Sequence, residues 1–191
     1  MAAPAKTGPA EYPKEFERDV TLKNGMRVHV RAIRPDDAPR LSELYDRLSR
    51  HTLYQRFFTT MKRLPPDWAR MFASVDYRTR FAVVAEHAGE HGPELVGVGR
   101  YEPTDDPETA EVAFVVQDGW QDRGLGTILF NDILRAASER GIRRFRAYVL
   151  ADNRRMLDLI TRFGDVHERK TDQGVTELLF TRREERAGAT R

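Results

Sequence analysis

The chain has 191 residues, of which 40% are hydrophobic, and this length and composition suit one globular domain with its own core. Its 32 basic and 30 acidic side chains give a formal net charge of +2, which is too balanced for a general polyanion binder. The lack of cysteine excludes disulfides, thiolate metal sites and a cysteine nucleophile. No apolar run approaches the roughly 20 residues of a membrane-spanning helix and no hydrophobic signal core begins the chain, so we expect a cytoplasmic protein without a membrane partner.

One domain is expected between two tails. Residues 1–14 are rich in Ala, Pro, Lys and Gly and show no apolar periodicity, which predicts a flexible N-terminal tail. Residues 184–191 predict a second flexible tail. No internal repeat and no long linker divides residues 15–183, so we expect a single domain there.

Strand and helix patterns alternate along the first half of the chain. The Asn24-Gly25 turn leads into residues 26–33, where apolar and polar residues alternate as in a half-buried strand. A helix begins after Pro35, and its apolar residues recur at helical spacing from Leu41 to Leu48. The next predicted elements are short helices at 52–58 and 67–72 and strands at 81–86, 95–101 and 111–116.

The second half predicts a parallel crossover. An amphipathic helix at 125–140 separates the strand at 111–116 from another at 145–150, and such a connection joins parallel strands with a right-handed crossover. The other connections are short enough for antiparallel neighbours, so we expect a mixed sheet in an α+β fold. The remaining elements are a helix at 153–163 and strands near 165–169 and 175–181.

The segment Gln121-Asp122-Arg123-Gly124-Leu125-Gly126-Thr127 joins the apolar strand to the crossover helix through two glycines. Gly124 and Gly126 let a ligand approach the backbone closely, and the first free N–H groups of the helix point at the same place. This pattern predicts a phosphate or pyrophosphate site, with a plain strand-to-helix turn as the alternative. The lack of a following Lys-Ser/Thr pair and of a third glycine excludes a nucleotide P-loop and a Rossmann fingerprint.

The same segment resembles the acyl-CoA-binding signature of the GNAT acetyltransferase superfamily, Gln/Arg-x-x-Gly-x-Gly/Ala. The resemblance extends in the right order from about residue 28 to residue 180: Asn153 opens a later helix and Phe163-Gly164 closes it. Upstream, three segments are similar to the GNAT domain of bacterial Pat-type protein-lysine acetyltransferases: Ile33-Arg34-Pro35-Asp36-Asp37, Leu53-Tyr54-Gln55-Arg56-Phe57-Phe58, and Asp76-Tyr77 before the strand at 82–85.

This resemblance implies a fold and a co-substrate. The fold would have six to seven mostly antiparallel strands, a parallel splayed pair and about four to five helices. The co-substrate would be acetyl-CoA, with no metal, and its pantetheine arm would pair with the exposed strand backbone as in β-augmentation. Asn153 would also cap its helix, a local role that by itself explains an asparagine there. The coenzyme-binding residues would be Phe114, Val115, Val116, Gln121, Asp122, Arg123, Gly124, Leu125, Gly126, Thr127 and Asn153.

Glu111 is the candidate general base. Acetyl transfer needs a neutral amine, yet a free lysine has a pKa of about 10.4, so a proton acceptor must lie nearby. Glu111 begins a strand that is apolar on both faces, which predicts a buried central strand and a carboxyl whose pKa is raised by burial. The same strand position carries the proposed base in several GNAT enzymes. The alternative is a strand-end glutamate that reaches solvent or pairs with an arginine.

The general acid departs from the family pattern. Many GNAT enzymes carry a tyrosine near the leaving thiolate, but the alignment of Asn153 and Gly164 places Ile160 at that position. The thiolate could leave unprotonated, or water or another residue could donate the proton. Tyr148 and Tyr101 are substitutes, although both fit core aromatics better.

We therefore predict an acetyl-CoA-dependent N-acetyltransferase in which a primary amine attacks the thioester directly in a ternary complex. A protein lysine is the favoured acceptor. We expect the protein to be a monomer or a homodimer. The alternatives are a small-molecule amine acetyltransferase and a non-catalytic acyl-CoA sensor. Residues 53–58 and Trp68 could line an acceptor groove or form an ordinary packed helix pair. Five arginines between 143 and 155 could meet the coenzyme's 3′-phosphate or form a solvated face. The balanced net charge argues against nucleic acid as a partner.

Overall fold

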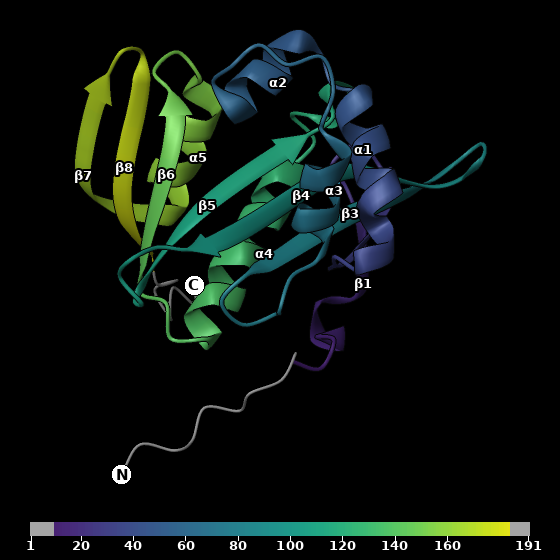
Figure 1. The fold of residues 1–191 in the computed structure, drawn as a ribbon, viewed down its shortest axis with the longest axis horizontal. Helices are drawn as coiled ribbons and strands as arrows, with labels where there is room; N and C mark the ends of the chain where they lie inside the picture. Colours follow the sequence, from purple (N-terminus) through teal and green to yellow (C-terminus); the bar gives the residue numbers. More distant parts are fainter. Residues whose placement is uncertain (1–9, 184–191) are drawn as a thin grey trace, which may run out of the picture.

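A mixed β-sheet runs through the protein (Figure 1) in the computed structural model, which describes residues 10–183. Within those residues the sheet has eight strands in the order β1-β2-β3-β4-β5-β6-β8-β7, and only β5 and β6 are parallel neighbours. The strands are β1 (Arg18–Thr21), β2 (Arg27–Ala32), β3 (Phe81–Gly89), β4 (Gly92–Pro103), β5 (Thr109–Val116), β6 (Arg144–Leu150), β7 (Gly164–Asp172) and β8 (Val175–Arg182).

Helices cover both faces of this sheet. In Figure 1, α1 and α3 lie in front of it, α4 lies behind it, and α2 lies beyond the ends of β5 and β6. The helices are α1 (Ala38–Asp46), α2 (Arg50–Phe57), α3 (Pro66–Ala73), α4 (Leu125–Glu139) and α5 (Arg154–Phe163), with 3₁₀ turns η1 (Lys14–Phe16), η2 (Pro35–Asp37) and η3 (Asp118–Trp120). The predicted mixed sheet with one parallel pair and five helices is confirmed.

The N-terminal segment differs from expectation in two ways. Strand β1, which no sequence pattern marked, pairs with β2 across the Asn24-Gly25 turn and brings the sheet to eight strands rather than six to seven. The Tyr12 hydroxyl donates to the Glu17 carboxylate at 2.8 Å and its ring meets Tyr77 edge-on, so packing begins before the expected boundary at residue 15. Most of the expected N-terminal tail and the whole expected C-terminal tail lie outside the described residues.

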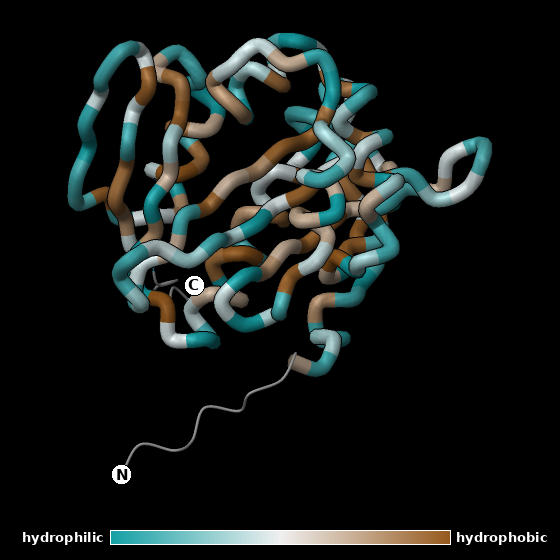
Figure 2. The backbone as a smooth tube through the Cα atoms, in the orientation of Figure 1, coloured by the Kyte–Doolittle hydropathy of each residue, from teal (hydrophilic) through white to brown (hydrophobic). Residues whose placement is uncertain are grey.

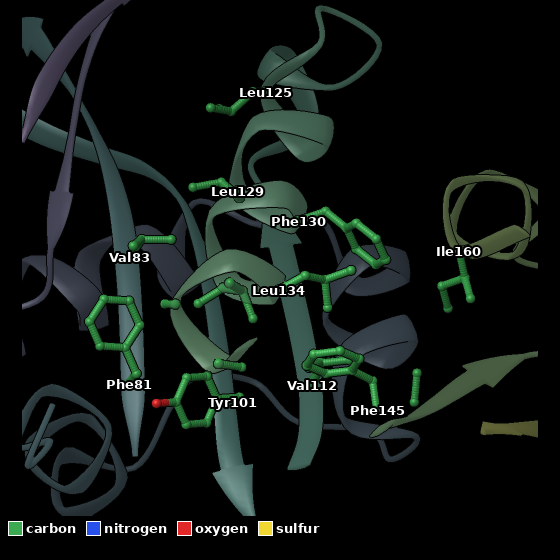
Figure 3. Packing of buried hydrophobic residues seen from close by; sticks show 14 of the residues in the cluster. Phe81, Val83, Tyr101, Val112, Leu125, Leu129, Phe130, Leu134, Phe145 and Ile160 are labelled. Carbon is green, nitrogen blue, oxygen red and sulfur yellow. The ribbon is translucent and has the colours of Figure 1, made fainter. Parts of the chain in front are cut away.

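The hydrophobic core has one layer on each face of the sheet. Helix α4 packs its buried side chains on one face, where Figure 3 shows Leu129, Phe130 and Leu134 among Val112 and Phe145. Helices α1 and α3 cover the other face with a second buried cluster. Figure 2 shows the hydrophobic residues concentrated along the central strands and hydrophilic residues in the outer loops. Within residues 10–183, no helix is long and apolar enough to cross a membrane.

Strands β5 and β6 pair only at their beginnings. Their register joins Thr109–Glu111 to Arg144–Arg146, and Figure 1 shows them diverging beyond that point. Meanwhile β5 pairs with β4 as far as Val116, and β6 pairs with β8 as far as Leu150. The edge of β5 that faces β6 is therefore without a strand partner beyond Glu111, as the predicted splay requires.

A buried ion-pair network fixes α1 against the sheet. Arg31 of β2 donates two hydrogen bonds of 2.7 Å to the Asp37 carboxylate and one of 2.7 Å to Glu86 of β3, while Arg40 of α1 donates to Glu86 at 2.9 Å. The backbone N–H of Arg34 donates to Asp37 at 2.8 Å. Burial alone would raise the pKa of Asp37, but these hydrogen bonds hold it below its usual value.

We expect Asp37→Ala to lower the free energy of unfolding by about 3–5 kcal/mol, because it leaves the guanidinium of Arg31 buried without its main partner. Urea unfolding at pH 7 measures the loss, and exposed Asp36→Ala is the matched control, expected within about 0.5 kcal/mol of the parent. The contribution of Asp37 is present above its unfolded pKa, about 3.9, and disappears as pH falls through its lower folded pKa. Equal losses in the two variants would contradict this role.

Candidate functional site

A cavity of about 730 Å³ occupies the splay between β5 and β6, a size typical of ligand sites. It lies between the free edge of β5, the first turn of α4, the end of β6 and the first turns of α5, with α2 on the remaining side. The sequence-predicted residues that line it are Glu111, Phe114, Val115, Val116, Gln121, Asp122, Gly124, Gly126, Thr127 and Asn153.

The two-glycine segment forms the N-terminal end of α4. Gly124 has φ +91° at the N-cap position, a left-handed conformation that favours glycine. A Cβ at Gly126 would meet no atom within 4 Å, so the space above this turn is open. The free N–H groups of the first helical turn give this space the character of an anion site.

Two predicted residues of this segment do not line the cavity. The Leu125 side chain is fully buried in the core, and the Arg123 guanidinium lies against the sulfur of Met26. The backbone of Leu125 still belongs to the first turn of α4, so only its N–H group can face a ligand there.

Helix α2 is tied over the cavity by Asp118. This carboxylate accepts hydrogen bonds from the Ser49 backbone N–H at 2.9 Å, the Ser49 hydroxyl at 2.7 Å and the Thr52 hydroxyl at 2.8 Å. Burial alone would raise the pKa of Asp118, but the hydrogen bonds from Ser49 and Thr52 lower it. Asp118 thus holds the N-terminus of α2 beside the strand-to-helix turn in its charged form.

The N-terminus of α5 closes the cavity from the other side. The Asn153 side chain accepts a hydrogen bond from the Met156 N–H at 3.3 Å, the predicted helix cap. Arg155 donates to the Gln121 side chain at 2.8 Å and forms an ion pair with Asp122 at 2.9 Å. Gln121 in turn donates to the Val116 carbonyl at 3.0 Å. These bonds connect α5 to the glycine segment across the splay.

The predicted burial of Glu111 is wrong. Its side chain is exposed, because it lies at the last paired position of β5 and β6 and borders two cavities instead of packing in the core. Within the described residues, Glu111 makes no hydrogen bond and no ion pair, although the cross-strand neighbour Glu102 makes several. The apolar residues that follow Glu111 on β5 therefore do not predict the exposure of the Glu111 side chain. Glu111 is a solvent-accessible carboxylate at the edge of the cavity.

Tyr148 of β6 lines the cavity and is 39% exposed, so it is not the core aromatic that its sequence favoured. Burial, then the nearby carboxylates of Glu177 and Glu111, raise its pKa above the usual value of a phenol, so the hydroxyl stays protonated. Ile160 lines the same cavity from α5. Tyr101, in contrast, is fully buried and donates to the Arg78 carbonyl at 2.6 Å, in agreement with a core role.

A second cavity of about 460 Å³ opens on the face of the sheet that α1 and α3 cover, where the last turn of α2 meets α3. Both cavities share Arg56, Glu111 and Ala113. The second cavity is also lined by Phe57, Trp68, Met71, Phe72, Arg80, Arg100, Glu102 and Pro103. Residues of the two predicted helices at 52–58 and 67–72 therefore do line a groove, and Glu111 lies where it meets the splay.

Glu102 neutralises two arginines of this groove. Arg80 donates to its carboxylate at 2.6 Å, and Arg100 donates to it at 2.9 Å while stacking on the Phe72 ring. Burial lowers the pKa of Arg100, and the positive charge of Arg56 lowers it further, whereas Glu102 opposes both effects.

The arginines between 143 and 155 do not form one basic group. Arg144 pairs with Asp106 at 2.7 Å at the start of β6, and Arg146 pairs with Glu177 at 3.1 Å. Arg154 and Arg155 alone line the splay cavity. Among residues 10–183, no cluster of His, Asp or Glu is arranged to hold a metal ion.

Sequence reasoning missed the residues that close the cavity from α2 and α5. No local pattern links residue 52 to residue 118, and the contribution of α2 depends on that long-range hydrogen bond. The available signal was the Asn153 cap, which fixes the first turn of α5 and with it Arg154 and Arg155. The missed lining residues are His51, Thr52, Asp152, Met156 and Leu159, whereas Gln55, Phe58, Arg154 and Arg155 were already candidates for the acceptor groove or for a phosphate contact.

Comparison with known proteins identifies similar chains. A family model described as "Acetyltransferase (GNAT) family" matches residues 42–165. The chain is 33% identical over 156 residues to acetyltransferase Pat of Mycolicibacterium smegmatis, covering 82% of this chain but only 46% of that protein. It is 29% identical over 152 residues to acetyltransferase PA5475 of Pseudomonas aeruginosa, covering 80% of this chain and 82% of that one. The chain thus spans about half the length of Pat.

Solved structures show the same fold. The GNAT domain of S. lividans PAT superposes with a TM-score of 0.78 at 36% identity, covering 90% of this chain and 99% of that domain. The acetyltransferase YncA of Salmonella typhimurium, solved with its cofactor acetyl-CoA, superposes with a TM-score of 0.64, covering 84% of this chain and 96% of that one. At 16% identity, the second likeness concerns the fold alone.

Proposed function

Because this chain belongs to the GNAT acetyltransferase family, we propose that it transfers the acetyl group of acetyl-CoA to a primary amine, with a protein lysine as acceptor. The observation that carries this proposal is the junction of two cavities at Glu111. The splay cavity suits the coenzyme, the groove beneath α2 and α3 suits the acceptor, and a ternary complex needs both at one point.

The residues of the splay fit a coenzyme A ester. The open turn at Gly126 and the first N–H groups of α4 suit the pyrophosphate. The free edge of β5 at Phe114, Val115 and Val116 offers backbone groups to the amide-bearing pantetheine arm. When bound, the thioester supplies an activated acetyl group, and backbone N–H groups of β5 stabilise the negative charge that develops on its carbonyl oxygen.

Glu111 is the proposed general base. An acceptor amine that enters through the groove reaches this carboxylate before the splay, so Glu111 can accept its proton directly or through water. Nitrogen then attacks the carbonyl carbon, the C–N bond forms and the C–S bond breaks, and the remaining extra proton on nitrogen leaves to water. The Tyr148 hydroxyl, on the cavity wall and held protonated, can return a proton to the departing sulfur.

The groove favours a long, flexible amine. Trp68 and Met71 are 41% and 46% exposed beside it, and apolar side chains in this position suit the aliphatic stem of lysine. The resemblance of three segments to Pat-type protein-lysine acetyltransferases supports a protein acceptor. The accessible, unpaired carboxylate of Glu111 favours turnover over a sensor that only holds the coenzyme.

We expect Gly126→Glu to abolish acetyl-CoA binding, because it places a carboxylate in the open anion site. Gly126→Ala should weaken binding about tenfold or more by crowding the same turn. Neither substitution meets a neighbouring atom, so both variants should stay folded, and alanine at this helical position should keep or slightly raise stability. Calorimetric titration and thermal unfolding measure the two effects. Unchanged affinity in a folded Gly126→Glu variant would remove the coenzyme from this site.

We expect Glu111→Gln to lower kcat by roughly 10²–10⁴-fold, the usual contribution of a positioned base. The acetyl-CoA dissociation constant should change little, because Glu111 lies at the junction and not at the glycine turn. Steady-state kinetics across pH 6–10 and calorimetry measure both quantities. Full turnover by the variant would assign proton acceptance to water or another group.

Tyr148→Phe tests whether the Tyr148 hydroxyl donates a proton or the side chain only lines the cavity. A donor role predicts at least a tenfold fall in kcat with little change in either KM, because the ring and its packing are retained. In the wild-type protein, kcat should not fall near pH 10, because the pKa of the Tyr148 hydroxyl is raised above the ordinary phenol value of about 10. Unchanged kcat would indicate that the thiolate leaves without this proton.

A further inference from the structure

We propose that the acceptor is a protein segment that carries an acidic side chain next to its target lysine, and that Arg56 binds this carboxylate. The inference rests on the proposed function and adds a determinant of acceptor choice. It concerns the groove beneath α2 and α3, whose residues include Arg56, Trp68, Met71 and Glu111.

Arg56 is the arginine of the groove that has no carboxylate partner. It lies in the last turn of α2 and faces both cavities, with its guanidinium over the Phe57 ring at 4.8 Å from the ring centre. Within residues 10–183, it forms no ion pair, whereas Arg80 and Arg100 both pair with Glu102. A guanidinium so placed presents a planar fork of donors that matches a carboxylate.

The segment around the groove is strongly basic. Residues 50–80, which contain α2 and α3, hold seven Arg or Lys against two Asp, a formal charge of +5 in a chain whose net charge is +2. The rest of the chain is therefore net negative, at −3. Arg80 of this segment pairs with Glu102 and Arg63 with Asp46, so Arg56 is the basic side chain of the groove lining that remains to attract an acidic segment.

Apolar side chains stand beside the same guanidinium. Phe57 contacts Trp68 with ring centres 6.0 Å apart, and Trp68 contacts Phe72 at 6.2 Å. Trp68 and Met71 stay partly exposed, as at protein-docking surfaces where aromatic anchors adjoin arginine. The groove thus offers three features within one cavity: an apolar wall for the lysine stem, Glu111 for the amine and Arg56 for a neighbouring carboxylate.

A polypeptide fits these features better than a free amino acid. The exposed Trp68 and Met71 extend the apolar wall beyond the junction at Glu111, and the basic segment 50–80 contains both helices. An amino acid would use Arg56 and Glu111 and leave the rest of this surface without a role.

The test uses three peptides that share one lysine and differ only in its two neighbours, which are Glu, Gln or Arg. Wild type should acetylate the Glu peptide with kcat/KM at least tenfold above that for the Gln peptide, mainly through KM, and the preference should shrink as salt rises. In Arg56→Gln the Glu/Gln ratio should fall to about one. In Arg56→Glu the order should reverse in favour of the Arg peptide. Calorimetry with acetyl-CoA shows whether these variants still hold the coenzyme.

Arg169→Gln is the matched control, because it removes the same charge from exposed β7 at the far edge of the sheet and should keep the wild-type ratio. Equal use of the Glu and Gln peptides by wild type would overturn the inference and leave the transferase intact. If free lysine is acetylated faster than the peptides and this rate depends on Arg56, the carboxylate that Arg56 binds belongs to a small molecule. That result would overturn the proposal that the acceptor is a protein segment. Failure to acetylate any peptide or amine despite saturable acetyl-CoA binding would remove the proposed function itself.

Discussion

The short parallel pairing of β5 and β6 is the constraint from which the site follows. Each strand is fully paired on its other side, β5 with β4 and β6 with β8, and these two antiparallel blocks diverge after Glu111. Backbone N–H and C=O groups left along the inner edge of β5 still require partners. No strand within the described chain supplies them there, and a ligand rich in amide groups can. The splay therefore creates the cavity and also determines the kind of molecule that fits it.

Helix α4 connects this gap to the hydrophobic core. Its apolar side chains pack under β3, β4 and β5, which fixes the axis of the helix, and its N-terminus consequently points into the splay. Gly124 permits the sharp entry to the helix, and Gly126 keeps the first turn open. On the opposite side, the Asp118 carboxylate holds α2 against the same turn. An anion site is thus built from elements whose positions are set by packing elsewhere.

Local patterns revealed the parts of the site that are contiguous in sequence. The glycine segment, the apolar strand before it and the Asn153 cap all follow from short-range spacing, and the resemblance to GNAT enzymes added the order of the elements. Exposure at Glu111 could not be read in this way, because it depends on the two cavities left beside it by elements distant in sequence and not on its neighbours along the strand. The same holds for Tyr148, whose strand neighbours are buried while its own face borders the cavity. Strand β1 is short and polar, and it is defined by pairing with β2 rather than by its own pattern.

Charge is distributed unevenly around the junction of the two cavities. Most charged side chains near it are paired: Glu102 with Arg80 and Arg100, Arg146 with Glu177, and Arg155 with Asp122. Within the described residues, Glu111 and Arg56 have no such partner, and both border both cavities. Paired charges hold elements in place, whereas unpaired charges of opposite sign at one point remain free for an incoming molecule. An amine with a carboxylate close beside it satisfies both at once, and this complementarity connects the chemistry proposed for Glu111 to the acceptor preference proposed for Arg56.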